Sequence, residues 1–457
     1  MVFRSISGWL MLISAGWLSA CSSSNDGTVT GDGSVRGIHA IPELGTVTFL
    51  IEETSLGTLN YKEASGTAEY DNLNYDFSFD VLLPGDSEAT RLATENVTVN
   101  AETEYTFVLT GTLADPEIIL WEQRGRNWDQ ELEDAEDNDT EVTVMEVSFG
   151  HLDTELGPVD VFFESPGTSP QSAKPLGTIE YGNQLPATEL TEGDYQLIVT
   201  PTGEPATILF ASDEISLSAA TSNLFTVMDS AGLTTANFAV RQVGLGADLT
   251  DLFAESELSV VHAAYGTEAL DTVVGDNFSN PLVSDLAYAE RSENVVIDDE
   301  PINLIVTPTG NPGVFLAQKE VEVANGSYNR LMLTGLPGLL QTVLLSHDQR
   351  TLATHARVQI FQGAARFQTM DIYLVADDVD ITLTGASYSS TLFGSGTGYQ
   401  AVQGEAYNLY LTEAGTKNII GGPLHLDLEV GRNYGIVIVD APDITAADIL
   451  FFDQTPD

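Results

Sequence analysis

Cysteine and basic residues are scarce in this 457-residue sequence. Its single cysteine is Cys21, so no disulfide can form within one chain, and each domain must be held together by its own hydrophobic core. Lysine and arginine total 16 against 68 acidic residues, a formal net charge of −52. A charge of this size and sign repels nucleic acid and anionic lipid headgroups. We therefore expect no nucleic-acid ligand and no electrostatic adhesion to a membrane.

The acidic composition has two interpretations. The surface could collect divalent cations such as calcium, or it could be a solvated surface adapted to a saline habitat, where salt screens the mutual repulsion. We favour the second interpretation, and we expect neither a bound metal nor another cofactor.

The surroundings of Cys21 predict where the protein resides. Arg4 is the only charged side chain among residues 1–20, the apolar run 5–20 follows it, and Leu-Ser-Ala stands directly before the cysteine. This pattern is typical of a secretory signal, and the 16 uncharged positions fall short of the ~20 that a membrane-spanning helix needs. The cysteine resembles that of a bacterial lipoprotein lipobox, in which the thiol receives diacylglycerol before cleavage, and Ser22 resembles an outer-membrane sorting signal. We predict lipid attachment (diacylglycerol and palmitate) at Cys21, with the protein anchored to the cell outer membrane and periplasmic or surface-exposed.

The remaining chain is built from repeats. Residues 195–203 read YQLIVTPTG, residues 303–310 read NLIVTPTG and residues 407–415 read YNLYLTEAG, with final glycines 107 and 105 residues apart. Alternating segments of five to eight residues, rich in Val, Ile, Thr and aromatics and separated by turn residues, are typical of a β-sandwich. The sequence thus predicts an all-β protein: four tandem immunoglobulin-like antiparallel β-sandwich domains, of seven or so strands each, after a cleaved lipoprotein signal. A short connecting helix is possible at 247–256.

The predicted organisation is a string of separate domains. The acidic segment 129–141 has eight carboxylates in thirteen residues. We expect it to be an extended, solvated linker because like charges repel. The expected divisions are a signal peptide at 1–20, a flexible tether at 21–33, repeat 1 at 34–128, the acidic linker at 129–141, repeat 2 at 142–250, repeat 3 at 256–352 and repeat 4 at 353–457.

Short motifs support a family resemblance. Residues 259–264 read SVVHAA, residues 159–163 read VDVFF, residues 286–288 read LAY, and two copies contain VTPTG. In these motifs the chain resembles a bacterial domain-of-unknown-function family, DUF4397, found as tandem copies in surface lipoproteins. The resemblance implies a β-sandwich outside the cytoplasm and implies no reaction. The first and fourth copies depart from the pattern, with Thr48 in place of the strand aspartate and Gln362 near the place of the histidine.

Two residue types recur at equivalent positions of the repeats. His39, His151 and His262 each end an opening strand, where a ligand or general-base role competes with a hydrogen-bonded structural role, which we favour. The strand aspartates alternate with inward-pointing residues, so we expect them to be solvated or to bond turns; they are Asp160, Asp271 and Asp371. The sequence contains no G-x-S-x-G, H-E-x-x-H or P-loop motif, and we predict that the protein is not an enzyme.

One local patch is a candidate binding site for glycan or peptide. Trp121 and Trp128 flank Arg124 and Arg126, although a strand-end tryptophan with a linker anchor would give the same pattern and is the interpretation that we favour. The functional hypothesis is a lipid-anchored envelope or cell-surface protein that acts as a non-catalytic binding or spacer module. Two alternatives stay open. A secreted hydrolase acting on glycan would need a groove of desolvated carboxylates. An assembly partner of an envelope complex would need an exposed apolar patch. Ligand, partner and oligomeric state are not predicted.

Overall fold

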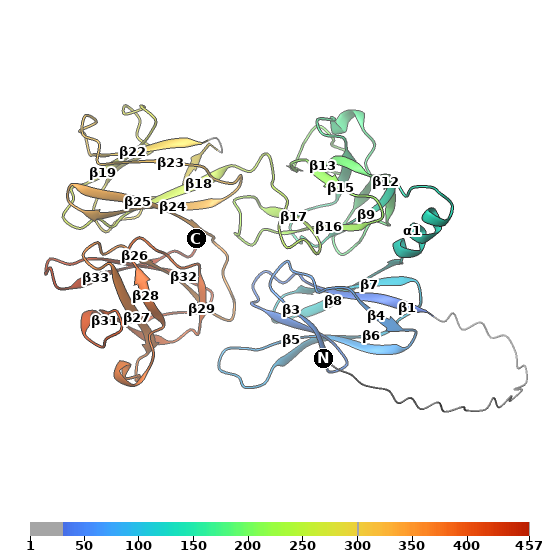
Figure 1. The fold of residues 1–457 in the computed structure, drawn as a ribbon, viewed down its shortest axis with the longest axis horizontal. Coiled ribbons are helices and arrows are strands. Elements are labelled where there is room, and N and C mark those ends of the chain that lie inside the picture. Colours follow the sequence, from blue (N-terminus) through green and yellow to red (C-terminus); the bar gives the residue numbers. More distant parts are fainter. Residues whose placement is uncertain (1–30, 299–300, 457) are drawn as a thin grey trace, which may run out of the picture.

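A computed structural model describes residues 31–298 and 301–456, which form four β-sandwiches in chain order (Figure 1). The signal peptide 1–20, Cys21 and most of the tether lie outside the described residues. Within the described part of the chain, no helix is both long enough and apolar enough to cross a membrane.

The first two sandwiches come from the N-terminal half of the chain. The strands of the first are β1 (Asp32–His39), β2 (Val47–Ile51), β3 (Thr54–Leu59), β4 (Ala68–Asp71), β5 (Asn74–Val81), β6 (Thr90–Thr98), β7 (Thr103–Gly111) and β8 (Pro116–Arg124). The helix α1 (Trp128–Asp137) follows. The elements of the second are β9 (Val144–His151), β10 (Val159–Glu164), η1 (Pro170–Ser172), β11 (Gly177–Ile179), β12 (Thr188–Thr191), β13 (Gly193–Pro201), β14 (Phe210–Ala211), β15 (Ile215–Leu217), β16 (Ser222–Asp229) and β17 (Phe238–Gln242).

The C-terminal half repeats the arrangement. The third sandwich contains β18 (Ser256–His262), β19 (Leu270–Val274), β20 (Val283–Leu286), β21 (Val295–Ile297), β22 (Ile302–Pro308), β23 (Ala317–Val321), β24 (Tyr328–Leu336) and β25 (Leu339–His347). The fourth contains β26 (Ala356–Gln362), β27 (Thr369–Ala376), η2 (Ile381–Leu383), β28 (Tyr388–Leu392), β29 (Gln400–Val402), β30 (Ala406–Glu413), β31 (Ile419–Asp427), β32 (Asn433–Asp440) and β33 (Ala447–Asp453).

All four sandwiches share one topology, which confirms the predicted all-β repeat. In the first sandwich, one sheet has the order β4-β1-β7-β8 and the other β3-β2-β5-β6, and the remaining three follow the same scheme. Most neighbouring strands are antiparallel. The opening strand of each copy, however, pairs in parallel with a strand near the end of the copy, as β1 does with β7 and β26 with β32. Because this pairing joins the two ends of each repeat, the repeat is a closed structural unit.

Two local expectations were wrong. The acidic segment is not an extended linker over its whole length, because residues 128–137 form α1, whose N-cap Asn127 accepts a hydrogen bond from the backbone N–H of Gln130. Asp129 and Glu131 in its first turn interact favourably with the positive end of the helix dipole, which offsets part of the charge repulsion. The segment 247–256 is not a helix; it forms turns, a β-bridge from Asp248 to Arg241, and the first residue of β18.

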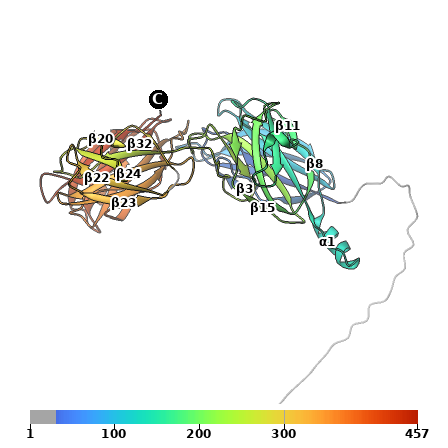
Figure 2. The same cartoon turned by 90° about the horizontal axis from the view of Figure 1, so that it is seen from above.

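The sandwiches are docked in pairs instead of forming a string, as Figure 1 shows and as the separate lobes of Figure 2 confirm. The sheet containing β1 and the sheet containing β9 each pack one face on the domain's own core and the other face on the partner sandwich. Ile38, Val108 and Trp121 of the first sandwich pack against Leu224 and Met228 of the second. The third and fourth sandwiches are joined in the same way by a second cluster, which contains Val261, Met332, Phe361 and Val437.

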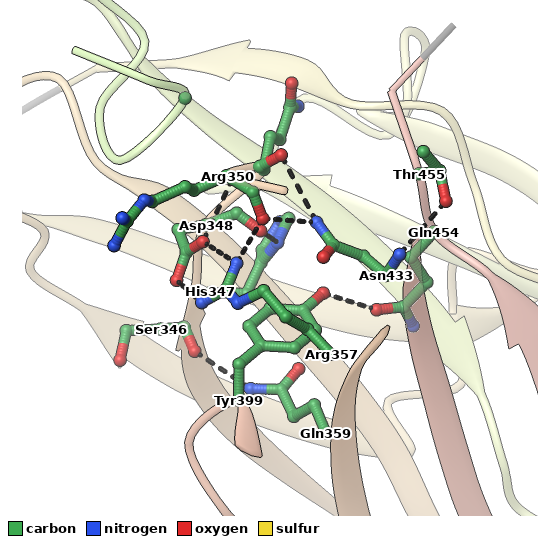
Figure 3. Close-up of polar contacts among 12 residues, drawn as sticks. Ser346, His347, Asp348, Arg350, Arg357, Gln359, Tyr399, Asn433, Gln454 and Thr455 are labelled. Carbon is green, nitrogen blue, oxygen red and sulfur yellow. Dashed lines mark hydrogen bonds and ion pairs between the residues drawn. The ribbon is translucent and has the colours of Figure 1, made fainter. Parts of the chain in front are cut away.

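The segment that connects the third and fourth sandwiches ties the two pairs together. The Arg350 guanidinium donates hydrogen bonds to the backbone oxygens of Pro42 and Leu44 and lies over the Tyr61 ring, 4.8 Å from its centroid. The Tyr61 hydroxyl in turn donates to the backbone oxygen of Asp229 in the second sandwich, at 2.6 Å. Figure 3 shows Arg350 beside Asp348 in this segment, opposite Asn433 of the fourth sandwich. Backbone hydrogen bonds from the Gln349 N–H to the Gly232 oxygen and from the Ala353 N–H to the Glu43 oxygen also join the two pairs, so Arg350 is one of several links between them.

Candidate binding clefts between paired sandwiches

The recurring histidines are buried and hold the loop that follows the opening strand. The Nε2 atoms of His39, His151 and His262 lie 2.9, 3.2 and 3.0 Å from the backbone oxygens of Gly45, Gly157 and Glu268. Burial lowers the pKa of all three, and that of His39 falls to about 4. They are neutral at pH 7 and hydrogen-bonded to backbone atoms, so their role is structural.

The recurring aspartates also bind turns. Asp160, Asp271 and Asp371 accept hydrogen bonds from the backbone N–H groups of the glycines that end the repeated TPTG-type turns, at 2.8, 3.1 and 2.8 Å. All three are buried, so of the two roles expected for them, turn bonding is the one observed and full solvation is not. These glycines, Gly203, Gly310 and Gly415, have positive φ, which a residue with a side chain adopts only with strain.

A cleft of about 870 Å³ lies between the first two sandwiches, beside α1. Its walls are the end of β8, the start of α1 and the loop that follows β11. Trp121, Arg124 and Arg126 line this cleft, and Trp128 lines a second cavity on the other side of the 125–130 segment. The four residues singled out from the sequence therefore do come together at one place in the fold, although not all of them are available to a ligand.

Trp121 is committed to the interface between the sandwiches. It is buried, and its Nε1 donates a hydrogen bond of 2.9 Å to the backbone oxygen of Gly182. Its ring occupies the space above Gly150, where an added Cβ would lie 2.2 Å from the ring. Its indole face is thus packed against the second sandwich and does not offer a stacking surface for a sugar.

Arg126 and Trp128 attach α1 to the second sandwich. The Arg126 guanidinium binds Glu131 of the helix at 2.7 Å and Glu189 of β12 at 3.0 Å, and lies 3.9 Å from the centre of the Trp128 ring. Hydrogen bonding to Glu131 and Glu189 raises the pKa of Arg126 above its ordinary value. The Trp128 Nε1 donates to the Ser222 hydroxyl at 2.9 Å. These contacts are those of a linker anchor.

Arg124 is the exposed cation of the cleft. Its side chain is 87% exposed, and its nearest carboxylate, Glu102, lies 3.9 Å away. Of the four sequence candidates, it is therefore the one whose guanidinium is free to meet a ligand.

Carboxylates gather on the far side of the 125–130 segment without forming a recognisable catalytic pair. They line a cavity of about 670 Å³ and are Asp32, Glu69, Glu102, Glu104, Asp129 and Glu133. Most of them are exposed, whereas a general acid needs a desolvated carboxyl group. Within residues 31–298 and 301–456, no three His, Cys, Asp or Glu side chains are placed to hold a metal ion.

Comparison with known families identifies the first repeat. Residues 33–131 match the family described as "Domain of unknown function (DUF4397)". The matched segment spans the first sandwich and the start of α1. The resemblance is thereby confirmed for the copy that departs from the quoted motifs at Thr48. A comparison with curated protein sequences gives no match.

Solved structures with some likeness to the chain include three bacterial proteins. A CBM26 carbohydrate-binding module from Eubacterium rectale Amy13K, in complex with maltoheptaose, shares 13% identity over 47% of this chain and 98% of its own. A putative adhesin from Bacteroides ovatus shares 11% over 51% and 98%, and a putative cell adhesion protein from Parabacteroides distasonis ATCC 8503 shares 8% over 68% and 98%. All three TM-scores are 0.15, so these likenesses transfer no function to the DUF4397 domain or to the rest of the chain.

The pair formed by the third and fourth sandwiches has a cleft at the position equivalent to that beside the DUF4397 domain. It measures about 1030 Å³. Gln454 occupies the place in this cleft that Gln123 occupies in the first. Gln454 pairs with Asn433 at the start of β32, and Gln123 pairs with the equivalent residue Glu104 near the start of β7. Arg291 occupies the place in this cleft that Gln184 occupies in the first, because each residue forms an isolated β-bridge to the opening strand of its own sandwich. The chain thus carries two related clefts with different linings.

Sequence reasoning missed the residues that join the domains. Lys62 is 3% exposed and pairs with Asp248 of the segment leading to the third sandwich, at 3.0 Å. Arg330 is 2% exposed at the interface of the third and fourth sandwiches. Such contacts join residues more than a hundred positions apart, so no local pattern reveals them. The one available signal was the rarity of basic residues, which makes each arginine or lysine worth locating.

Proposed function

We propose that this protein is a lipid-anchored envelope protein whose four β-sandwiches serve as a non-catalytic binding and spacing module. The observation that carries the proposal is that the repeated histidines and aspartates all form hydrogen bonds to backbone atoms of their own repeat. What duplication preserved is the loop geometry of the sandwich. The paired docking of the sandwiches supports the spacing role, since shared apolar interfaces make each pair stiffer than two domains on a free linker.

The anchoring part of the proposal is tested by changing Cys21. The wild-type protein is expected in the membrane fraction, with a diacylglycerol-modified N-terminal cysteine detected by mass spectrometry. Cys21→Ser is expected to leave an unlipidated chain that does not sediment with membranes. An unmodified mature N-terminus in the wild-type protein would contradict lipid anchoring.

The binding part is tested at the first cleft. Arg124→Gln removes the exposed guanidinium and is expected to weaken any oligosaccharide or peptide that binds there, measured by a glycan and peptide array followed by calorimetry. Lys319→Gln, on β23 of the third sandwich, removes the same charge elsewhere and is the matched control. Ligands that bind both variants and wild type equally would place binding outside this cleft.

A second candidate function, assembly with an envelope partner, is favoured by one apolar surface. Phe253, 61% exposed, lies with Ile208 and Val296 around a cavity of about 460 Å³ between the second and third sandwiches. Exposed apolar groups of this kind often mark protein contacts. Phe253→Ser should abolish cross-linking to a partner in intact cells if assembly occurs there, while Leu383→Ser, an equally apolar exposed position on η2, should not.

A further inference from the structure

The cleft between the third and fourth sandwiches contains an arginine without a carboxylate partner, although its lining also includes Glu293, Glu429 and Asp453. Arg291 and His347 line it, and Arg330 lies behind its wall, where its Nη1 reaches the lining residue Gln454 at 2.7 Å. The chain has 68 acidic residues to serve as partners for 16 basic ones. Because carboxylates far outnumber basic groups, each arginine at this cleft is expected to form an ion pair with a carboxylate.

Two of the arginines at this cleft have no carboxylate partner. Among the described residues, Arg291 forms no ion pair and its side chain makes no hydrogen bond. Arg330 bonds only neutral oxygens, those of Ser259, Gln359 and Gln454, and its Nη2 has no partner. A buried guanidinium with an unsatisfied N–H is costly, since desolvation of a charged donor is not repaid.

The neighbouring arginines show that carboxylates were available. Arg432, on the same cleft, binds Glu429 at 2.8 Å and Asp453 at 2.7 Å. Arg357 binds Asp348 at 3.0 Å and lies 4.4 Å from the Tyr399 ring, as Figure 3 shows. Arg291 and Arg330 thus differ from Arg432 and Arg357, each of which pairs with a carboxylate.

His347 lies within the field of these two charges. Its Nδ1 lies 3.3 Å from the backbone oxygen of Asp348, and its Nε2 is buried without a partner. Burial, then the positive charges of Arg330 and Arg291, lower the pKa of His347 to about 3. The histidine is therefore neutral at pH 7, and the site has two positive charges with no negative charge paired to either.

We propose that this cleft binds a small oxyanion, held by Arg291 at the cleft wall and attracted by the buried charge of Arg330. A guanidinium offers parallel N–H donors that match the oxygens of phosphate, sulfate or carboxylate. This site is separate from the ligand cleft beside the first sandwich and does not depend on membrane anchoring. In the related first cleft the neutral Gln184 stands at the position of Arg291, so this particular arginine occurs only in the cleft of the second pair.

The test is direct binding to the full mature chain, prepared unlipidated as Cys21→Ser. Phosphate, sulfate and acetate are titrated by calorimetry at constant ionic strength, so that general salt effects are equal in all arms. We expect saturable binding of one tetrahedral anion per chain. Preference for acetate over phosphate and sulfate would instead identify a carboxylate ligand at the same site.

Arg291→Gln is the decisive variant, because glutamine already fills the equivalent position in the second sandwich and the fold accommodates it. Loss of the charge-assisted hydrogen bonds should weaken binding about tenfold or more. Arg291→Lys should retain part of the affinity, and Lys319→Gln, with the same change of charge, should bind as wild type. Unaltered affinity in Arg291→Gln would overturn the proposal, as would a wild-type chain with no saturable binding, whose unpaired Nη2 would then be satisfied by water.

Discussion

At the scale of single residues, the fourth repeat shows what the histidines of the other three do. Gln362 stands at the histidine position, donates through Nε2 to the Phe367 oxygen at 2.6 Å, and accepts from the Ala364 N–H at 2.6 Å. His39 makes the same two kinds of contact, with Gly45 and Ile41. An amide replaces an imidazole only where hydrogen bonding, and not proton transfer, is required.

The first prediction concerns this exchange. His39→Gln should lose less than about 1 kcal/mol of unfolding free energy, because both hydrogen bonds can be retained. His39→Leu leaves the Ile41 N–H and the Gly45 oxygen without a partner and should cost about 2–4 kcal/mol. Denaturant unfolding of the two variants measures the difference; equal losses would assign His39 a packing role alone.

The second prediction is acid sensitivity. A buried histidine with a lowered pKa takes up its proton on unfolding, so its contribution to stability is complete above pH 6.5 and is lost as the pH falls toward the folded pKa. For His39 this pKa is about 4, which corresponds to roughly 3 kcal/mol. Asp153 and Asp251, whose pKa values are raised by burial, act in the opposite direction. Relative to His39→Gln, the wild-type protein should lose stability as the pH falls from 7 to 5, which thermal unfolding of the two proteins side by side measures.

The role of a residue was predictable from the sequence where its contacts lie within one strand and the turn beside it. The histidines and turn-binding aspartates follow from their repeated places at strand ends. The availability of Trp121 and Arg126 did not follow, because the first is covered by Gly182 of another domain and the second by Glu189 of another domain. Burial by a partner domain depends on residues too distant in sequence for composition or alternation to indicate.

At the scale of elements, α1 is a helix with little holding it in place. It buries none of its residues and has no basic residue in its last turn, so its attachment depends on the contacts of Arg126 and Trp128. Its formation has a physical reason: the Asn127 cap and the favourable position of acids in the first turn offset the charge repulsion that would favour an extended segment.

The third prediction follows from this weak attachment. A glutamate-specific protease should cut first within residues 129–141, because these glutamates are exposed and α1 has no core to protect it. Arg126→Gln should accelerate this cleavage severalfold by removing the bonds to Glu131 and Glu189. Arg124→Gln, which changes an exposed arginine two residues away, should cleave as wild type. First cleavage inside a sandwich would contradict the assignment.

Strand positions were predictable because alternation of apolar residues is a local property. The parallel pairing of β1 with β7 was not, since it joins segments separated by the rest of the repeat. The docking of sandwiches in pairs left one trace in the sequence: β32 contains the continuous apolar run 436–439, whereas a strand with one solvated face alternates.

At the scale of the whole molecule, the side-chain contacts of Arg350 add to the backbone hydrogen bonds that join the two pairs. The fourth prediction is that Arg350→Ala raises the radius of gyration measured by solution scattering, while the melting temperature changes little because neither pair's core is altered. Arg91→Ala, which removes an exposed ion pair with Asp80, is the control and should leave the shape unchanged. An unchanged radius in Arg350→Ala would show that other contacts suffice to join the pairs.

The fifth prediction concerns the net charge. Without residues 1–20 the chain has 68 acidic and 15 basic residues, a difference of −53. Repulsion among these charges destabilises the compact state and is screened over ~10 Å at 0.1 M salt and ~3 Å at 1 M. Sodium chloride should therefore raise the melting temperature, and calcium should have no greater effect than magnesium at equal concentration. A melting temperature independent of sodium chloride would show that the charge is neutralised locally.

The Arg350 contact can form only after most of the chain has been synthesised. Arg350 and Pro42 are 308 positions apart, so the first pair of sandwiches can emerge and fold while its arginine is still being synthesised. Until then the Tyr61 ring and the Pro42 and Leu44 oxygens have nothing from the C-terminal half against them. A chain truncated before residue 350 would keep this surface uncovered permanently. The junction therefore distinguishes a finished molecule from an incomplete one.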